Sequence, residues 1–378
     1  MTDREKVTEA LLEAAKSADE PENFGDDQLR AAAIEAFGSW EAALAAGLIE
    51  AVSSGRGGRR KPAVADVNRT RGEAYENPLY VETEDRKFYS FDGPQLEVSD
   101  GAQLLDDAGL VGAVRAIHYA GDSDGLVLFS TQGRYFGLDR RMIPSWAARG
   151  ERRSIRDVLF LTQDEGICAV VPRRQVATGR VVHVTRGGKG KATDAGEYDG
   201  RDRSGKQAFK VRTGDRPIAV FGVGRDTTIF CASALGRGIH FEADEMRSMG
   251  RNAVGVNVIK LADDDDAVVG AFEGKRVRQI AVITEEGLGK RVEFSEFRTQ
   301  GRAGQGMQLA RLNPGDRLAG VVACNPAEDV ALTSNEGRVW RLPAGSFHLM
   351  GRPAKGNRMV ELSDGERIIH LQALPCGG

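Results

Sequence analysis

The hydrophobic positions near the start of the chain recur every three to four residues. Residues 4–18 and 26–48 are rich in Ala, Leu and Glu, and place apolar side chains at helical spacing, as at Leu29 and Ala33. This spacing puts them on one face of a helix. The sequence therefore predicts a small α-helical domain of two or three helices over residues 1–50.

Hydrophobic periodicity is absent from the next segment. Residues 51–77 include the stretch GRGGRRKP and hold no apolar stripe. A stretch without an apolar face has nothing to bury, so we predict a basic flexible linker. Its arginines suit a phosphate backbone, but a solvated linker is the preferred interpretation.

A strand–turn–strand pattern then recurs over residues 78–376. A short apolar strand is followed by a Ser/Thr-x-x-Gly turn and a second strand, as in LFSTQGRYFGL and LTSNEGRVWRL. The leading hydroxyl residues are Thr83, Ser130, Thr185, Ser233, Thr284 and Ser334. The steps between them are 47, 55, 48, 51 and 50 residues, a regularity that indicates about six copies of one structural repeat.

A glycine-arginine segment keeps the same period. It reads MGRNAVG, QGRAGQG and MGRPAKG in the last three repeats, and each repeat then ends in another apolar strand, such as RLAGVVACN. These elements give about four strands per repeat. Radial stacking of four-stranded sheets buries each face against a neighbour and leaves few free edges. The predicted fold class is all-β, a six-bladed propeller-like ring of four-stranded blades.

The charge is divided unevenly along the chain. The formal charge is −3, but residues 1–50 hold 4 Lys and Arg against 12 Asp and Glu, a net of −8. The rest of the chain therefore carries +5. A charge of this size does not by itself require a polyanionic partner, because the positions of the basic residues matter more than their sum.

No motif for catalysis or for metal or nucleotide binding stands out. The four cysteines and five histidines are dispersed, and the run Asp263–Asp266 lacks the spacing of an EF-hand loop. We expect no catalytic residue, metal or cofactor, and therefore no enzyme. Because no apolar segment is long enough for a bilayer and no secretion signal is present, the sequence predicts a cytoplasmic protein without membrane contact.

The repeat motifs resemble those of a known family. A Thr-x-x-Gly-x-x-Lys/Arg hairpin paired with a later M-G-R-x-x-x-G-V segment resembles the C-terminal β-pinwheel of the gyrase A protein and of its topoisomerase IV counterpart, over residues 79–375. Chromatin-associated propellers with repeats of similar length carry a Gln-Leu-Gly signature that is absent here. The resemblance implies a disc whose basic rim bends double-stranded DNA.

The resemblance also implies candidate DNA-binding residues. Arg and Lys at the hairpins and second loops recur once per repeat, although such residues are also common simply because turns face water. The candidates are Arg134, Arg140, Arg141, Arg186, Lys189, Lys191, Arg237, Arg251, Lys290, Arg291, Arg302, Arg338, Arg352 and Lys355. Interleaved acids, including Glu285, Glu286 and the run Asp263–Asp266, would repel DNA from one sector.

Two features depart from gyrase. Gyrase carries a basic box of the form QRRGGKG in the second loop of its first blade, whereas RGGKGK at residues 186–191 directly follows the hairpin residue Thr185. We therefore do not transfer the role of the box. About 80 residues precede the first repeat, too few for a winged-helix cleavage domain, so we do not expect DNA cleavage.

Three functional hypotheses follow. The leading one is a non-enzymatic, nucleoid-associated architectural protein that bends or wraps DNA largely without sequence preference. The second is an accessory subunit that docks on a topoisomerase or another DNA-processing protein through the N-terminal helices. Within these predicted helices, the stretch FGSWEAALAAGL resembles a helical repeat found beside homing endonucleases. The third is a propeller-like scaffold for protein partners.

Overall fold

The computed structural model describes residues 79–83, 88–91, 114–120, 125–143, 155–198 and 203–374. The chain divides into two compact units, residues 1–61 and 62–378, and every described residue belongs to the second. The helical domain predicted over residues 1–50 and the linker predicted over residues 51–77 lie outside the described residues.

The Ser/Thr-x-x-Gly motif forms the tight turn of a β-hairpin. Between β7 (Arg180–Thr185) and β8 (Lys189–Asp194), the Gly188 amide donates to the Thr185 carbonyl at 3.0 Å. Gly188 has a φ of +73°, a conformation that favours glycine. The Thr185 hydroxyl oxygen accepts a further hydrogen bond from the Lys189 amide at 3.2 Å. The hairpin predicted from this motif is confirmed.

The described strands form six antiparallel sheets, each named here by the first strand of its hairpin. Four of them have four strands. In spatial order these are β6 (Ile167–Pro172), β4 (Gly125–Ser130), β5 (Arg134–Asp139), β9 (Lys206–Gln207); β10 (Pro217–Val223), β7, β8, β13 (Val256–Asn257); β14 (Val268–Glu273), β11 (Thr228–Ser233), β12 (Arg237–Glu242), β17 (Met307–Gln308); and β18 (Leu318–Cys324), β15 (Gln279–Thr284), β16 (Leu288–Glu293), β21 (Asn357–Arg358).

The first and last sheets have three strands within the described residues. They are β2 (Phe88–Phe91), β1 (Leu79–Thr83), β3 (Val114–Tyr119) and β20 (Val339–Pro343), β19 (Asp329–Ser334), β22 (Ile368–Leu374). The expectation of four strands is therefore met by four of the six sheets.

Short helical turns follow several strands. They are η2 (Arg140–Met142), α4 (Ile155–Val158), η4 (Arg173–Val176), η5 (Ala195–Tyr198), η6 (Ala243–Glu245), η7 (Phe294–Glu296) and η8 (Ala344–Ser346). Of these only α4 is an α-helix, so the described part of the chain is essentially all-β.

The outer strand of each four-stranded sheet comes from the following repeat. The Gly-Arg segment after β12 supplies β13, yet β13 pairs with β8 of the preceding sheet, Val256 opposite Gly190. In the same way β9, β17 and β21 pair with β5, β12 and β16. Within the described residues, the last four repeats thus have the four predicted strands and the first two have three, and no four-stranded sheet is built from one repeat.

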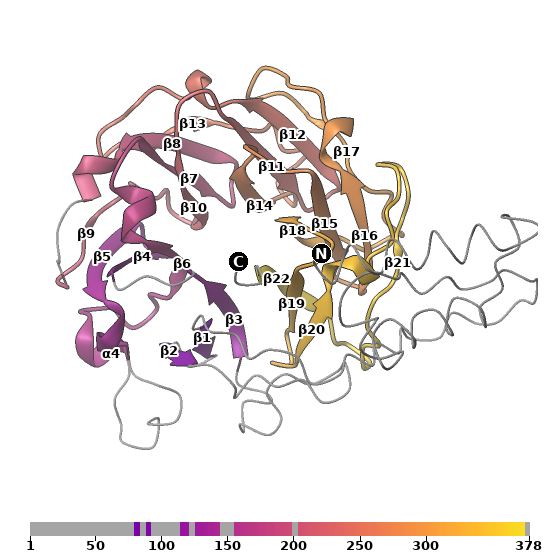
Figure 1. Ribbon diagram of the computed structural model, residues 1–378, viewed down its shortest axis with the longest axis horizontal. Helices are drawn as coiled ribbons and strands as arrows, with labels where there is room; N and C mark the ends of the chain where they lie inside the picture. The colour runs from indigo at the N-terminus through magenta and orange to yellow at the C-terminus, as the bar shows by residue number, and fades with distance from the viewer. Residues whose placement is uncertain are drawn as a thin grey trace, which may run out of the picture. The chain divides into compact units, whose positions relative to one another are not determined.

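The strand that closes each repeat lies at the inner edge of its sheet. The inner strands β3, β6, β10, β14, β18 and β22 contact one another in this order, and β22 contacts β3. Figure 1 shows the sheets arranged radially around a common centre, with the short strands β9, β13, β17 and β21 on the outside. The described residues therefore have the propeller-like arrangement that the repeat pattern predicts.

A separate hydrophobic layer fills the space between consecutive sheets. In β7, Val182 and Val184 pack against Ile229 of the β11 sheet, whereas Val181 packs with Val127 of the β4 sheet. Because side chains alternate across a strand, one strand serves the layers on both of its faces. This explains why the strands read as nearly continuous apolar runs.

Glycine at the end of each Gly-Arg segment allows the outer strand to approach the preceding hairpin. Gly306 has a φ of +71°, and a Cβ atom there would lie 2.6 Å from the carbonyl oxygen of Gly238.

We expect Gly306→Ala to lower the free energy of unfolding by about 2 kcal/mol or more in urea titrations, because the alanine would be strained at this φ and its Cβ would clash with Gly238. Gly301→Ala in the same segment is the control, since its Cβ would meet no atom nearer than 4.0 Å. Equal effects would show that the close approach has no energetic weight.

Candidate nucleic-acid interface

Two of the candidate lysines are buried and hold a loop of the following repeat. Lys191 and Lys290 are each 0% exposed. The Lys191 Nζ donates to the carbonyl oxygens of Gly250 and Arg251 at 2.9 and 2.8 Å. Lys290 makes the equivalent pair of hydrogen bonds to the next Gly-Arg segment, at 2.9 and 2.6 Å. The expectation that these two lysines face outward is corrected, because they anchor the strand exchange.

Burial changes the acidity of both ammonium groups. Desolvation is the main cause that lowers the pKa of Lys191 and of Lys290 to about 8, and the neighbouring Arg251 and Arg352 guanidinium groups act in the same direction. An opposing attraction comes from the nearby glutamates. Both side chains therefore carry a charge at neutral pH that folding makes less favourable.

The candidate arginines of the Gly-Arg segments bind the preceding repeat. Arg251 pairs with Glu197 of η5 at 3.1 Å, and Arg352 lies 3.7 Å from Glu296 of η7. Arg302 donates to two backbone carbonyls of the preceding repeat at 3.1 and 2.9 Å. All three side chains are half-buried, so much of their hydrogen-bonding capacity is used within the protein.

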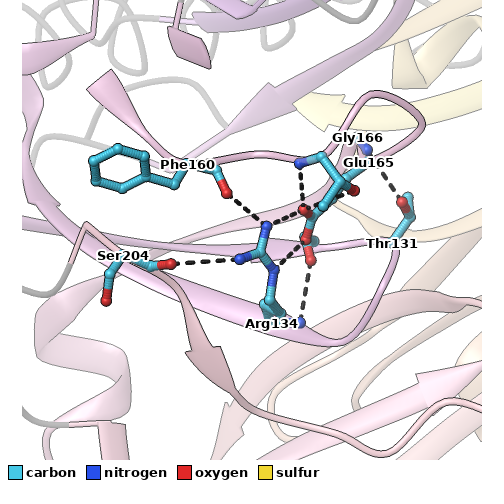
Figure 2. A network of polar contacts seen from close by, with 8 residues as sticks. Thr131, Arg134, Phe160, Glu165, Gly166 and Ser204 are labelled. Carbon is cyan, nitrogen blue, oxygen red and sulfur yellow. Dashed lines mark hydrogen bonds and ion pairs between the residues drawn. The ribbon is translucent and has the colours of Figure 1, made fainter. Parts of the chain in front are cut away.

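Two hairpin arginines form ion pairs with buried glutamates. The Arg134 Nε donates to Glu165 Oε1 at 3.0 Å, and a second nitrogen contacts Glu165 Oε2. Figure 2 shows that this guanidinium also reaches the carbonyls of Phe160 and Ser204, at 2.7 and 3.4 Å. Arg338 is bound in the same way, with its Nε 2.7 Å from the buried Glu366. These arginines hold the outer loop to the hairpin.

Glu165 is stabilised as a carboxylate although it is buried. Burial alone raises its pKa, but hydrogen bonds from Arg134, Ser130 and the Thr162 amide outweigh it and hold the pKa below the usual range. A group of this kind stabilises the fold above its unfolded-state pKa, and the contribution is lost as the pH falls through the lower folded value.

Glu165 belongs to a series of acids that sequence reasoning missed. The equivalent positions are Glu165, Asp215, Asp266, Asp316 and Glu366. The shorter aspartates accept backbone amide hydrogen bonds in place of an arginine, as Asp266 does from Leu235 at 3.0 Å. Within the run Asp263–Asp266, the first three side chains are exposed and Asp266 is buried. The signal was present in the sequence, because these acids recur in steps of 50 and 51 residues.

The remaining candidates differ in exposure. Arg291 is half-buried and donates to the Phe347 carbonyl at 2.7 Å, and Lys189, also half-buried, contacts Asn257. Arg140 is half-buried as well. The exposed candidates are Arg141, Arg186, Arg237 and Lys355. The structure places the RGGKGK stretch in the β7–β8 hairpin and its flanking strand.

A second set of basic residues recurs on the outer loop, and the sequence analysis did not select it. The backbone amides of Lys210, Lys260 and Arg311 donate to carbonyls of the next Gly-Arg segment, at 3.4, 2.9 and 3.4 Å. All three side chains are exposed. The same position is Phe160 in the preceding repeat and Glu361 in the last one, and we call these five residues the outer-loop position. Aligning the repeats at their period of about 50 would have found it.

The described residues offer no site for a metal ion. Across residues 79–374, within the described ranges, no group of three or more His, Cys, Asp or Glu side chains is arranged to hold one. Burial lowers the pKa of His183 to about 3, and its Nε2 lies 2.8 Å from the Tyr198 hydroxyl. None of the described helices is long and apolar enough to cross a membrane.

Comparisons with known proteins agree with this architecture. A family model described as the DNA gyrase C-terminal domain, β-propeller, matches residues 227–273, 278–325 and 328–375. The DNA gyrase A protein of Salmonella typhimurium is 32% identical over 212 residues, which are 56% of this chain and 24% of that protein. The Escherichia coli protein of the same name is 33% identical over 190 residues, covering 50% and 22%. This chain therefore spans about a quarter of the length of these relatives.

Solved structures show the same fold at lower sequence identity. The DNA gyrase A C-terminal domain has a TM-score of 0.67 and 18% identity, over 79% of this chain and 100% of that one. The C-terminal domain of DNA topoisomerase IV has a TM-score of 0.61 and 19% identity, over 79% and 94%.

Fold, strand exchange and repeat motifs together define an all-β, propeller-like repeat protein. The resemblance to the C-terminal β-pinwheel of the DNA gyrase A protein is confirmed, because the last three repeats match its family model and the described residues share its fold. Both the family model and the similar structures are C-terminal domains.

The buried lysines make a prediction about pH. For Lys290 the folded pKa of about 8 lies below the ordinary value of 10.5, so between these values the unfolded state binds more protons. The free energy of unfolding of the wild type should therefore rise relative to Lys290→Met as the pH increases from 8 to 10.5, by on the order of 1–3 kcal/mol. Urea titrations across this range measure it, with Lys355→Met as a control that should keep the wild-type slope. Parallel curves for wild type and Lys290→Met would contradict the assignment.

Proposed function

We propose that this chain is a non-enzymatic architectural protein that binds and bends double-stranded DNA around the outer edge of its sheets, largely without sequence preference. The observation that carries the proposal is the outer-loop position. It presents an exposed cation at Lys210, Lys260 and Arg311, in steps of 50 and 51 residues, in three consecutive repeats. Similarity to the DNA gyrase A protein supports DNA as the polyanion.

A regular row of cations suits a regular row of phosphates. Each neutralised phosphate releases counterions, which gives affinity without sequence information. Smooth bending of 20–30 base pairs costs roughly 1–6 kcal/mol, and contacts to several repeats offset it only if the DNA follows the curved edge. The radial arrangement in Figure 1 supplies such an edge.

The candidate residues divide into three groups within this proposal. The exposed Arg141, Arg186, Arg237 and Lys355 contact phosphates directly. The half-buried arginines offer only part of a guanidinium to DNA while they hold the loops in place. Lys191 and Lys290 contribute by positioning the Gly-Arg segments.

The proposal also covers the architecture and the location. The six repeats form six blades that close the ring, the N-terminal residues form the small helical domain, and the protein acts on the nucleoid in the cytoplasm. The similarity to part of a topoisomerase also favours a second function, in which the chain docks on such an enzyme as an accessory protein and changes supercoiling. Co-purification of the full chain with a topoisomerase distinguishes this function from independent DNA binding.

Salt dependence tests the outer-loop position. The full chain should bind arbitrary duplexes of about 40 base pairs, with a log Kd that rises linearly with log salt. The triple substitution Lys210→Ala, Lys260→Ala, Arg311→Ala should reduce that slope by about 2.7, or 0.9 for each lost phosphate contact. Fluorescence anisotropy at several salt concentrations measures it.

A charge-matched control separates position from total charge. Arg225, Lys275 and Arg276 are exposed in the turns that follow the inner strands β10 and β14. Replacing these three by Ala removes the same charge and should leave most of the slope. If both triple variants lose equal slope, binding depends only on net charge, and if the wild type does not bind, the proposed function fails.

A further inference from the structure

The outer-loop position carries an exposed aromatic ring in one repeat. Phe160 is 74% exposed, the highest value among the large hydrophobic side chains whose exposure the structure describes. The equivalent residues in the next three repeats are Lys210, Lys260 and Arg311. A single exposed apolar side chain is common on protein surfaces. What sets Phe160 apart is that it occupies the position at which three consecutive repeats present a cation.

The structural equivalence is set by the backbone. The Phe160 amide donates to the Arg203 carbonyl at 3.5 Å, and Lys210 and Lys260 make the same contact to the following Gly-Arg segments. The Phe160 carbonyl accepts from Arg134 at 2.7 Å, as the Glu361 carbonyl accepts from Arg338 at 3.1 Å. The ring is therefore presented where the other repeats present a cation.

The backbone on either side of the ring is firmly held. Leu159 is buried, and its amide donates to the Ile155 carbonyl at 2.8 Å. The Leu161 amide donates to the Leu159 carbonyl at 2.8 Å, and its side chain packs against the core of the β4 sheet. Figure 2 shows the Phe160 ring pointing away from the Arg134–Glu165 network that fixes its carbonyl. A side chain that inserts between stacked bases must be held by a rigid backbone, and the backbone at Phe160 is held in this way.

We propose that Phe160 is a wedge that inserts between base steps of the bound duplex and kinks it at one end of the row of cations. Apolar side chains used in this way partly unstack a step and bend the duplex. This inference rests on the proposed function, since the same path that meets three cations must reach the ring. The opposite end of the row is Glu361, which repels phosphates, so the kink lies at the Phe160 end.

The test compares Phe160→Ala with the full-length wild type on a duplex of about 40 base pairs rich in flexible TA steps. Three readouts are taken: affinity against salt, energy transfer between dyes on the two ends, and permanganate reactivity of thymines, which reports unstacking. Phe160→Ala should bind roughly fivefold to tenfold more weakly with an unchanged salt slope. It should also transfer less energy and lose the hyperreactive thymine.

Two further variants make the result specific. Phe160→Lys introduces the residue type of the neighbouring repeats. It should raise the salt slope above that of the wild type by about 0.9, and it should not give the hyperreactive thymine. Ile369→Ala removes a 40% exposed apolar side chain from the inner strand β22 and should match the wild type.

The outcomes separate the wedge from the proposed function. Bending and thymine reactivity of Phe160→Ala equal to those of the wild type overturn the wedge while DNA binding stands. A wild type that binds no duplex overturns the proposed function and the wedge together.

Discussion

The structure depends on one constraint: a four-stranded sheet is complete only when the next repeat supplies its outer strand. β13 pairs with β8, and the buried Lys191 ties the segment that leads into it to the same strand. The β13–β8 pairing is thus reinforced by hydrogen bonds from a charged ammonium group. Because the outer strand comes from the next repeat, removing one repeat would leave the preceding sheet with an open edge. Neighbouring repeats therefore stabilise one another in series, as in other repeat proteins.

The same constraint places the basic residues. The Gly-Arg segments that cross to the preceding sheet also carry Arg251, Arg302 and Arg352, whose contacts with that sheet fix the position of the outer loops. At the outer-loop position, the backbone amides of Phe160, Lys210, Lys260 and Arg311 donate to the next Gly-Arg segment, so the position shares the spacing of these segments. The regular spacing of this position along the edge is thus a consequence of regular strand exchange, whereas the residue type at each position varies, from Lys and Arg to Phe160 and Glu361.

Local features of the fold could be predicted from the sequence, and non-local ones could not. The turn at Thr185 follows from a hydroxyl residue and a glycine three positions apart, which need no other part of the chain. The partner of β13 and the burial of Lys290 depend on a segment about 60 residues away, and no spacing rule reports them. A stricter alignment of the repeats would have selected the outer-loop residue Lys260, but it would not have predicted that its side chain is exposed.

The most direct test of whether DNA bends far enough to wrap around the outer edge is a topological one. Nicked circular plasmid is ligated with increasing amounts of the full chain, the protein is removed, and the topoisomers are resolved on a gel. DNA that follows a curved edge over several repeats should shift the linking-number distribution in proportion to protein, and the sign of the shift gives the hand of the path. An unchanged distribution under conditions where the chain is bound would contradict wrapping.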